Sequence, residues 1–167
     1  MPDDLGRAVA VARAPLRIVS LAPGATEMLF AAGAGGQLIA TVEYSSEPAA
    51  ARGVPRIGDV AAIDMERLVA LQPDVVIAWP AGGNPAQRAK IAALGIPLYQ
   101  QQVARLADLP GSLRRLGVLA GTEAAAEPAA AALEARLSAL NRTYSGLRTD
   151  GHRPTVLLQV WNRPIYT

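Results

Sequence analysis

The chain has 167 residues, of which 51% are hydrophobic, so it can build one domain of ordinary size with a substantial core. Its formal net charge is only +2 and its basic residues are scattered, so a nucleic-acid partner is not indicated. It contains no cysteine, which excludes disulfides, thiolate metal sites and cysteine nucleophiles.

The N-terminal residues lack the basic-then-apolar pattern of a secretory signal. No apolar run reaches the roughly 18 residues that a membrane-spanning helix requires. We therefore expect either a cytosolic protein or a chain from which a signal has been removed.

The first sixty residues predict two short strands separated by a helix. After an extended arm or edge hairpin over residues 1–16, the β-branched run 17–21 predicts a buried strand that ends in a Pro-Gly turn. A helical pattern over residues 26–32 stops at a glycine, as helices commonly do. Residues 38–42 predict the second strand, and a long loop follows.

The next sixty residues repeat this alternation. Asp64 is expected to cap a short helix over residues 65–71. The run 74–79 is continuous, apolar and β-branched, as buried strands of parallel sheets are. A helix at 86–94, a strand at 96–99 and a leucine-marked helix at 106–119 follow. Strands that alternate with helices at this spacing predict an α/β lobe with a Rossmann-like parallel sheet.

Residues 122–147 form the longest stretch without a turn signal and predict a helix roughly 37 Å long at about 1.5 Å per residue. Thr122 is its expected N-cap. Pro128 is expected either to bend the first turns or to delay the start of the helix. The apolar seam of this helix consists of Leu133, Leu137, Leu140, Tyr144 and Leu147.

A polar break and a strand at residues 155–160 follow the long helix. We therefore expect three parts: an N-terminal lobe at residues 1–121, a connecting backbone helix at 122–148, and the incomplete start of a second lobe at 149–167.

Ligands of open parallel sheets bind outside the carboxyl ends of the strands. This rule selects the loops at residues 22–25, 43–48 and 79–84, which contain Tyr44 and Trp79. An indole at the end of a strand offers a flat apolar wall with a polar N–H to a large ring-shaped ligand. The alternative is that both aromatic residues only close the end of the sheet.

Residues suited to catalysis are sparse. The single histidine, His152, lies in the break after the long helix, and no phosphate-binding loop, dinucleotide motif or nucleophile elbow is present. Asp59 is interpreted as a loop residue and Asp64 as a cap. Because no set of nucleophile, base and orienting residue emerges, we expect a binding protein rather than an enzyme, with no metal site and no cofactor.

The helix at residues 65–71 has one apolar side, expected to consist of Met65, Leu68 and Val69. Glu66 lies about 200° around the helix from Leu68 and is expected to face solvent. From the residues alone, Glu66 is an ordinary exposed charge near a helix N-terminus.

Four segments occur in the order RIVSLAPGATEMLFAAGAG, TVEYSSEP, IDMERLVALQPDVVIAW and LLQVWNRPIYT. Together they resemble the cobalamin-binding members of the helical-backbone class of periplasmic binding proteins, which deliver corrinoid to an ABC importer. The resemblance covers residues 3–167. It implies two α/β lobes joined by one long helix, with the ligand in the cleft between them, and it implies that most of the second lobe is absent from this chain.

The resemblance also implies roles for individual residues. The corrin-approaching loop corresponds to Pro23, Gly24 and Ala25, the ring-contacting aromatic residues to Tyr44 and Trp79, and the second lobe's first contribution to Val160 and Trp161. Val60 stands where some members place another tryptophan, so one wall of the cleft is thinner here. Glu66 matches the carboxylate that docks against arginines of the importer.

The implied function is non-covalent capture of cobalamin or a related corrinoid in the periplasm and its delivery to an ABC importer. With one lobe's walls only, we expect weak or undetectable corrinoid binding. We also expect the exposed strand and helix seam to favour a homodimer or larger assembly.

Two alternatives remain open. One is a haem or ferric-siderophore binding protein of the same class, with Tyr44 or Tyr166 as the axial ligand of a haem. The other is an enzyme or interaction module that reuses the lobe outside transport.

Overall fold

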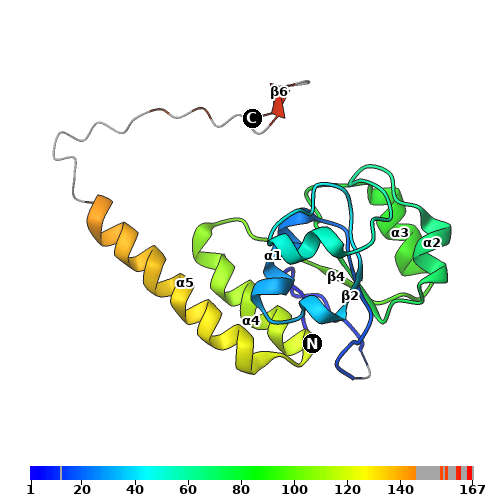
Figure 1. Cartoon of the computed structure of the whole chain (residues 1–167), viewed down its shortest axis with the longest axis horizontal. Helices are drawn as coiled ribbons and strands as arrows, with labels where there is room; N and C mark the ends of the chain where they lie inside the picture. Colours follow the sequence, from blue (N-terminus) through cyan, green and yellow to red (C-terminus); the bar gives the residue numbers. More distant parts are fainter. Residues whose placement is uncertain (12, 146–154, 156, 158–160, 163–164, 167) are drawn as a thin grey trace. The chain divides into compact units, whose positions relative to one another are not determined.

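A parallel sheet of four strands organises residues 1–135 (Figure 1). The computed structural model describes residues 1–11, 13–145, 155, 157, 161–162 and 165–166. Residues 1–135 and 136–167 are two separate units. The three-part division with boundaries at residues 121 and 148 stays a prediction.

The sheet has the strand order β2-β1-β3-β4, and every neighbouring pair is parallel. Its strands are β1 (Ile18–Ser20), β2 (Leu38–Ala40), β3 (Val75–Ala78) and β4 (Leu98–Gln100). The predicted α/β fold with a parallel sheet is therefore confirmed. Because β2 lies on one side of β1 and β3 on the other, the chain order reverses between β1 and β3, which makes their carboxyl ends the switch point of the sheet.

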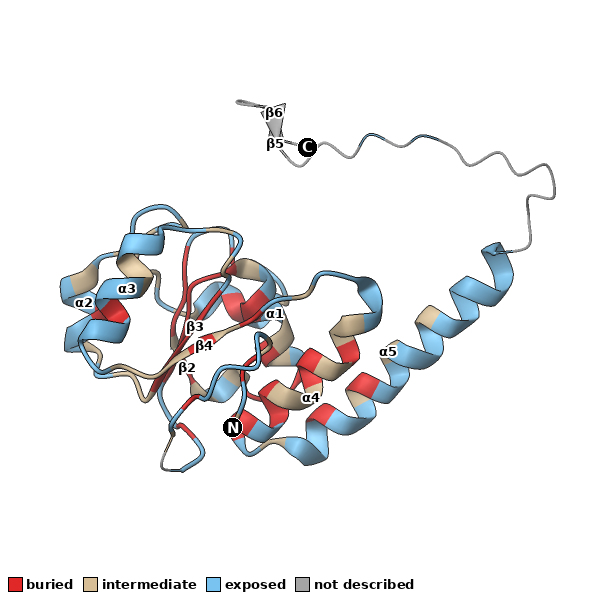
Figure 2. Ribbon diagram, turned by 180° about the vertical axis from the view of Figure 1, so that it is seen from behind, coloured by how far each residue is buried: buried red, intermediate tan, exposed pale blue. Residues whose placement is uncertain are grey.

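Helices cover both faces of this sheet (Figure 1). The α-helices of the first unit and its boundary are α1 (Pro23–Ala31), α2 (Met65–Ala70), α3 (Pro85–Ala93), α4 (Leu109–Ala120) and α5 (Glu123–Tyr144), with short 3₁₀ turns at Gly35–Gln37, Ala49–Gly53 and Leu106–Asp108. Every residue of β1 and β3 is buried (Figure 2), which explains why β3 is a continuous apolar run rather than an alternating one.

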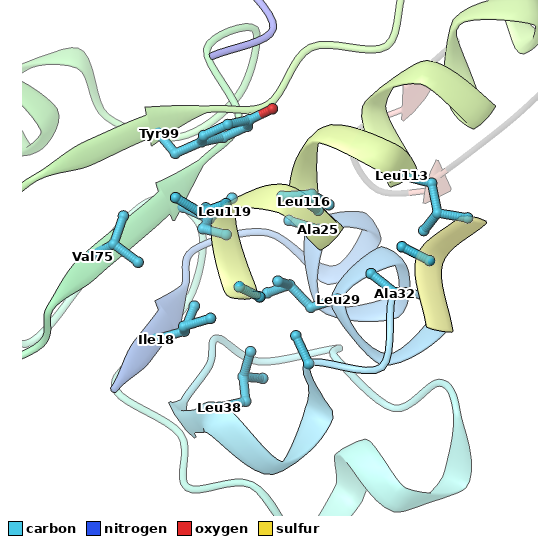
Figure 3. Packing of buried hydrophobic residues seen from close by; sticks show 14 of the residues in the cluster. Ile18, Ala25, Leu29, Ala32, Leu38, Val75, Tyr99, Leu113, Leu116 and Leu119 are labelled. Atoms are coloured by element: carbon cyan, nitrogen blue, oxygen red, sulfur yellow. The ribbon is translucent and has the colours of Figure 1, made fainter. Parts of the chain in front are cut away.

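Two hydrophobic clusters lie on the two faces of the sheet. Ile18, Val75 and Ile77 belong to the cluster that contains residues of α1, α4 and α5, and Figure 3 shows this packing. Val19 and Val76, one position along each strand, belong to the cluster formed with α2 and α3. Successive strand residues thus point to opposite faces, and the unit has three layers.

Two helices begin earlier than predicted, and both begin with proline. Pro23 is the first residue of α1 and Pro85 the first residue of α3. Proline suits this position because the first N–H of a helix has no intrahelical partner in any case. Hence Pro23, Gly24 and Ala25 form the first turn of α1, and the prediction that they form a loop is wrong.

Helix α2 confirms one local prediction and contradicts another. The Oδ1 atom of Asp64 accepts a hydrogen bond from the backbone N–H of Arg67 at 2.9 Å, as expected of an N-cap. Leu68 is fully buried, but Val69 is 46% exposed, so the prediction that Val69 faces the core is wrong. The two side chains point about 100° apart, and in a helix of six residues only one of them reaches the sheet.

The N-terminal arm is a hairpin that is held on the sheet by Asp4. Pro2 and Ala8 form an antiparallel bridge, which confirms the hairpin prediction for these residues. The carboxylate of Asp4 is fully buried and accepts hydrogen bonds from Tyr99 Oη at 2.6 Å and from Arg115 Nε at 2.7 Å. Burial, together with the neighbouring Asp4 carboxylate, raises the pKa of the Tyr99 hydroxyl well above its ordinary value.

The long helix is present as α5 and contains 22 residues, about 33 Å at 1.5 Å per residue. It begins five residues before Pro128, so the proline does not delay its start. Thr122 directly precedes α5, as predicted for its N-cap, but its side-chain hydroxyl is buried and has no hydrogen-bond partner among the described residues, so it supplies no side-chain cap. The backbone carbonyl of Thr122 accepts from the N–H groups of Ala125 and Ala126 instead.

The first turns of α5 pack closely against the lobe through small residues. Ala126 and Ala130 are its buried residues, and Ala126 lies directly against Gly117 of α4. Arg114 of α4 forms salt bridges with Glu127 at 2.8 Å and with Glu134 at 2.7 Å. Helix α5 is therefore held on α4 both by the close approach of the two backbones and by the two salt bridges of Arg114.

The later part of the predicted seam is solvent-exposed at Leu140 and Tyr144, whereas Leu147 lies outside the described residues. The described part of the chain contains no helix that is long and apolar enough to cross a membrane.

In the second unit, β5 (Trp161–Asn162) pairs antiparallel with β6 (Ile165–Tyr166). The predicted strand at 155–160 falls mostly outside the described residues, and its two described members, Thr155 and Leu157, have no regular structure. The expected homodimer stays a prediction.

Candidate functional site

An apolar groove of about 650 Å³ lies at the carboxyl end of the sheet. It is lined by Ala22, Pro23, Gly24, Ala25, Glu27, Met28, Ala31, Trp79, Gln101, Val103, Leu109, Leu113 and Leu133. These residues follow β1, β3 and β4 or belong to α1, α4 and α5, so the groove lies at the switch point where open α/β sheets bind ligands.

The first turn of α1 forms part of the lining of the groove. Pro23, Gly24 and Ala25 all line it, although as helical residues rather than as the expected loop. A Cβ atom added to Gly24 would meet no heavy atom within 4 Å, so the space in front of this turn is open. A flat ligand can therefore approach the backbone of α1 without a side chain in between.

Trp79 also lines the groove, one residue beyond the end of β3. Its side chain is 45% exposed, although the strand that precedes it is completely buried. The indole lines the large groove with one side, and with Val60 it also lines a small crevice behind the groove.

Tyr44 lies near the same edge of the sheet but does not belong to the residues that line the groove. Its φ angle is +66°, a left-handed conformation that costs a non-glycine residue roughly 1–2 kcal/mol. Its side chain is 67% exposed. The neighbouring Ser45 is anchored, because its carbonyl accepts a hydrogen bond from Arg56 Nη2 at 2.7 Å.

A buried network of hydroxyl groups ties the Tyr44 loop to the first turn of α1. The Oγ1 atoms of Thr26 and Thr41 lie 2.7 Å apart, and Thr41 donates to Ser45 Oγ at 2.9 Å. Thr26 also donates to Ser20 Oγ at the end of β1 at 2.9 Å. Because all four hydroxyls are buried, mutual hydrogen bonds satisfy them and connect the Tyr44 loop to the first turn of α1.

The remaining predicted residues lie elsewhere. Val60 lines the crevice behind Trp79, and Glu66 is exposed on α2, which covers the other face of the sheet from the groove helices. Trp161 belongs to β5, but its side chain is outside what the structure describes. Val160 and His152 also fall outside the described residues.

Several groove residues were missed by the sequence analysis. Gln101 follows β4, is buried and donates a hydrogen bond to the sulfur of Met28. The rule on carboxyl ends, applied to the fourth strand as well, selects Gln101 and Val103. Leu113 and Leu133 come from helix faces that only the packing of α4 and α5 brings to the groove.

The chemistry of the groove is that of a binding surface. Glu27 is its single titratable side chain among the lining residues. The described residues contain no group of three His, Cys, Asp or Glu side chains placed to hold a metal ion. An apolar surface with few polar groups suits non-covalent binding of a large, mostly apolar ligand.

Comparisons with a family model and with known proteins point to the same family. A family model described as "Periplasmic binding protein" matches residues 18–167. The vitamin B12-binding protein of Vibrio campbellii is 37% identical over 151 residues, which are 90% of this chain and 54% of that protein. The vitamin B12-binding protein of Pectobacterium carotovorum is 35% identical over 153 residues, 92% of this chain and 55% of that protein.

Solved structures of periplasmic binding proteins resemble this chain as well. The periplasmic vitamin B12-binding protein BtuF of Vibrio cholerae superposes with a TM-score of 0.82 at 33% identity, covering 91% of this chain and 58% of that one. The periplasmic heme-binding protein RhuT from Roseiflexus sp. RS-1 superposes with a TM-score of 0.65 at 32% identity, covering 75% and 49%. The chain spans about half the length of the curated relatives that it matches, and it belongs to the periplasmic binding protein family.

Proposed function

We propose that this chain provides one lobe of a substrate-binding protein that captures cobalamin or a related corrinoid in the periplasm and delivers it to an ABC importer. The observation that carries the proposal is the half-exposed indole of Trp79, which faces an apolar groove at the switch point of the sheet. The names of two similar relatives, vitamin B12-binding proteins at 35% and 37% identity, support the same ligand class.

In this proposal the corrin ring lies against Trp79 and the first turn of α1. Trp79 supplies the flat wall, and Pro23, Gly24 and Ala25 supply a surface that the ring edge approaches closely. Tyr44 contacts the ligand from the neighbouring loop, outside the groove itself. Val60 leaves space behind the indole, and the roles of Val160 and Trp161 stay predictions.

The second candidate, a haem-binding protein, is favoured by the likeness to the heme-binding protein RhuT at 32% identity. Haem iron requires an axial ligand such as His, Tyr, Cys or Met. Among the residues that line the groove, only Met28 has a side chain of that kind. Cobalamin carries its own axial cobalt ligands, an upper ligand and the base of its nucleotide loop, so the protein need not supply one. An apolar aromatic wall therefore suffices for it, and the corrinoid is the better match to the groove.

Glu66 is proposed as a docking residue for the importer. It is exposed at the first turn of α2, and the groove residues Ala25 of α1 and Leu113 of α4 belong to the cluster on the opposite sheet face. A carboxylate in this position can meet a basic surface while the ligand site stays occupied. Such surface charges mainly steer and orient the partner rather than add affinity.

The test is a titration of nitrogen-15-labelled protein with cyanocobalamin at millimolar concentration, followed by two-dimensional amide NMR. This method detects the weak binding that a single wall allows. We expect shifts of the Trp79 indole N–H and of the amides at residues 22–28 and 101–103. Trp79→Ala should remove most of the shift, whereas Leu94→Ala, a side chain of similar exposure at 49%, should leave it unchanged.

The proposal fails if cyanocobalamin causes no shifts, or if the shifts lie away from the groove. Stronger binding of haemin than of cyanocobalamin, measured by absorbance under the same conditions, would favour the haem candidate instead. Shifts that survive Trp79→Ala unchanged would contradict the role of the indole.

A further inference from the structure

We infer that Arg88 and Gly82 are positioning residues that hold the indole of Trp79 in its groove-facing orientation. This inference deepens the proposed function and rests on it for the ligand. It concerns the loop at residues 80–84, which leaves β3 and leads into α3. Neither Arg88 nor Gly82 lines the large groove, so both act through Trp79.

Gly82 provides the surface on which the indole lies. A Cβ atom added to Gly82 would come within 2.2 Å of Trp79 Cε3 and 2.3 Å of Cζ3. Real Cβ atoms do not approach another atom so closely, so only glycine permits the ring to lie where it does. The backbone N–H of Gly82 also donates to the carbonyl of Trp79 at 3.3 Å, which folds the loop back under the ring.

Arg88 fixes this loop from α3. Its Nη1 donates to the carbonyl of Gly82 at 2.8 Å and its Nη2 to the carbonyl of Pro80 at 3.1 Å. Arg88 forms no salt bridge within the described part of the chain, so these two carbonyls are the partners of its guanidinium. The planar fork of arginine suits two acceptors at a set spacing, whereas lysine offers a single point charge.

The helix that carries Arg88 is itself anchored. The side chain of Asn84 caps α3 by accepting from the N–H of Ala86 at 2.9 Å. Ile91, three residues beyond Arg88, is fully buried in the cluster on the α2 and α3 side of the sheet. A continuous set of contacts therefore runs from the core through Arg88 to Gly82, and from Gly82 to the indole.

The half-exposed state of Trp79 makes this support necessary. A buried indole is held on all sides by packing, but the ring of Trp79 is 45% exposed and has protein contacts on only part of its surface. Substitutions in the loop therefore should displace the ring rather than unfold the lobe. Loss of one well-placed aromatic contact corresponds to about two- to tenfold weaker binding.

The quenching experiment uses the full chain with Trp161→Phe, so that Trp79 is the only tryptophan, and the binding experiment uses the parent chain with Trp161 in place. Gly82→Ala, Arg88→Ala and Arg88→Lys are compared with two controls: Gly36→Ala, whose added Cβ meets nothing within 4 Å, and Arg67→Ala, which removes an exposed arginine. The first readout is acrylamide quenching of Trp79 fluorescence in the ligand-free protein. The second is the dissociation constant for cyanocobalamin from the indole N–H shift, with circular dichroism to confirm folding.

We expect stronger quenching in Gly82→Ala and Arg88→Ala, an intermediate value in Arg88→Lys, and no change in either control. Cyanocobalamin binding should weaken about two- to tenfold, most in Gly82→Ala and Arg88→Ala and less in Arg88→Lys. Unchanged quenching in both Arg88→Ala and Gly82→Ala would overturn the inference, and so would an equal change in the controls. If Gly82→Ala does not fold, the two Arg88 variants decide.

The two proposals fail separately. If the parent protein does not bind cyanocobalamin, the proposed function is wrong, but the quenching of the free protein still decides whether Arg88 and Gly82 hold the indole.

Discussion

Gly117 lies in the last turn of α4, where helix propensity and tertiary packing predict opposite effects of replacing it with alanine. In an isolated helix, Gly→Ala stabilises by about 1 kcal/mol. In this protein, a Cβ atom on Gly117 would lie 2.3 Å from the Cβ atom of Ala126 on α5. Both atoms are attached directly to helix backbones, so no change of rotamer relieves the overlap.

The magnitude follows from the distance. Ordinary contact begins at 3.4 Å, so the two helices must separate locally by about 1 Å, which is the kind of overpacking that costs about 1–3 kcal/mol. After the propensity gain of about 1 kcal/mol, we expect Gly117→Ala to lower the free energy of unfolding by up to about 2 kcal/mol.

Gly111 is the matched control in the same helix. Its added Cβ would lie 3.4 Å from Arg115 Nη1, the end of a flexible side chain, so Gly111→Ala should be neutral or stabilising by up to about 1 kcal/mol. Urea unfolding followed by circular dichroism measures both variants. In the double variant Gly117→Ala with Ala126→Gly, the overlap is removed, so the two substitutions should cost less together than separately.

The reasoning is refuted if Gly117→Ala is as stable as Gly111→Ala or more stable. That result would mean that the two helices are not in close contact at Gly117.

Three further predictions follow from the polar contacts. Because burial raises the pKa of Tyr99 above that of an unfolded tyrosine, the unfolded chain loses its proton first as the pH rises above about 10; the free energy of unfolding should fall there, and Tyr99→Phe should flatten the fall in urea titrations. Arg114 lowers the pKa values of Glu127 and Glu134 below the ordinary 4.5. The stabilisation by these exposed salt bridges should therefore be present above that pH and be lost as the pH falls below it. Arg114→Met should abolish that loss and reduce the sensitivity of the urea midpoint to added sodium chloride. Thr26→Val removes the central hydroxyl of a buried network and should cost about 1–3 kcal/mol, whereas Thr143→Val on the exposed end of α5 should be nearly neutral; equal costs would contradict the role of the network.

Much of the local structure was predictable because it depends on neighbouring residues. The continuous β-branched run around β3 and the cap at Asp64 were predicted and are present. The long helix was also predicted, and α5 begins within one residue of the expected start. The start of α1 was missed by three residues, because proline at the first helical position resembles a turn when it is judged from the sequence alone.

The candidate site was predictable only in part. The carboxyl-end rule selected Trp79 and the Pro23–Ala25 turn, and both line the groove. Tyr44 satisfied the same rule but does not line it. Residues such as Leu133 carry no signal of their own, because a leucine on an amphipathic helix has the same pattern whether it faces a core or a ligand.

The sequence by itself determined which segments become strands and helices and where several of them begin and end, because these choices depend on the conformational preferences of residues adjacent in the chain. Only the tertiary structure decided that β1 lies beside β3, that Gly117 meets Ala126, and that Trp79 lies on Gly82. Those contacts depend on how side-chain volumes fit once the helices pack on the sheet, and a missing side chain at a glycine has meaning only when the neighbour that occupies its space is known.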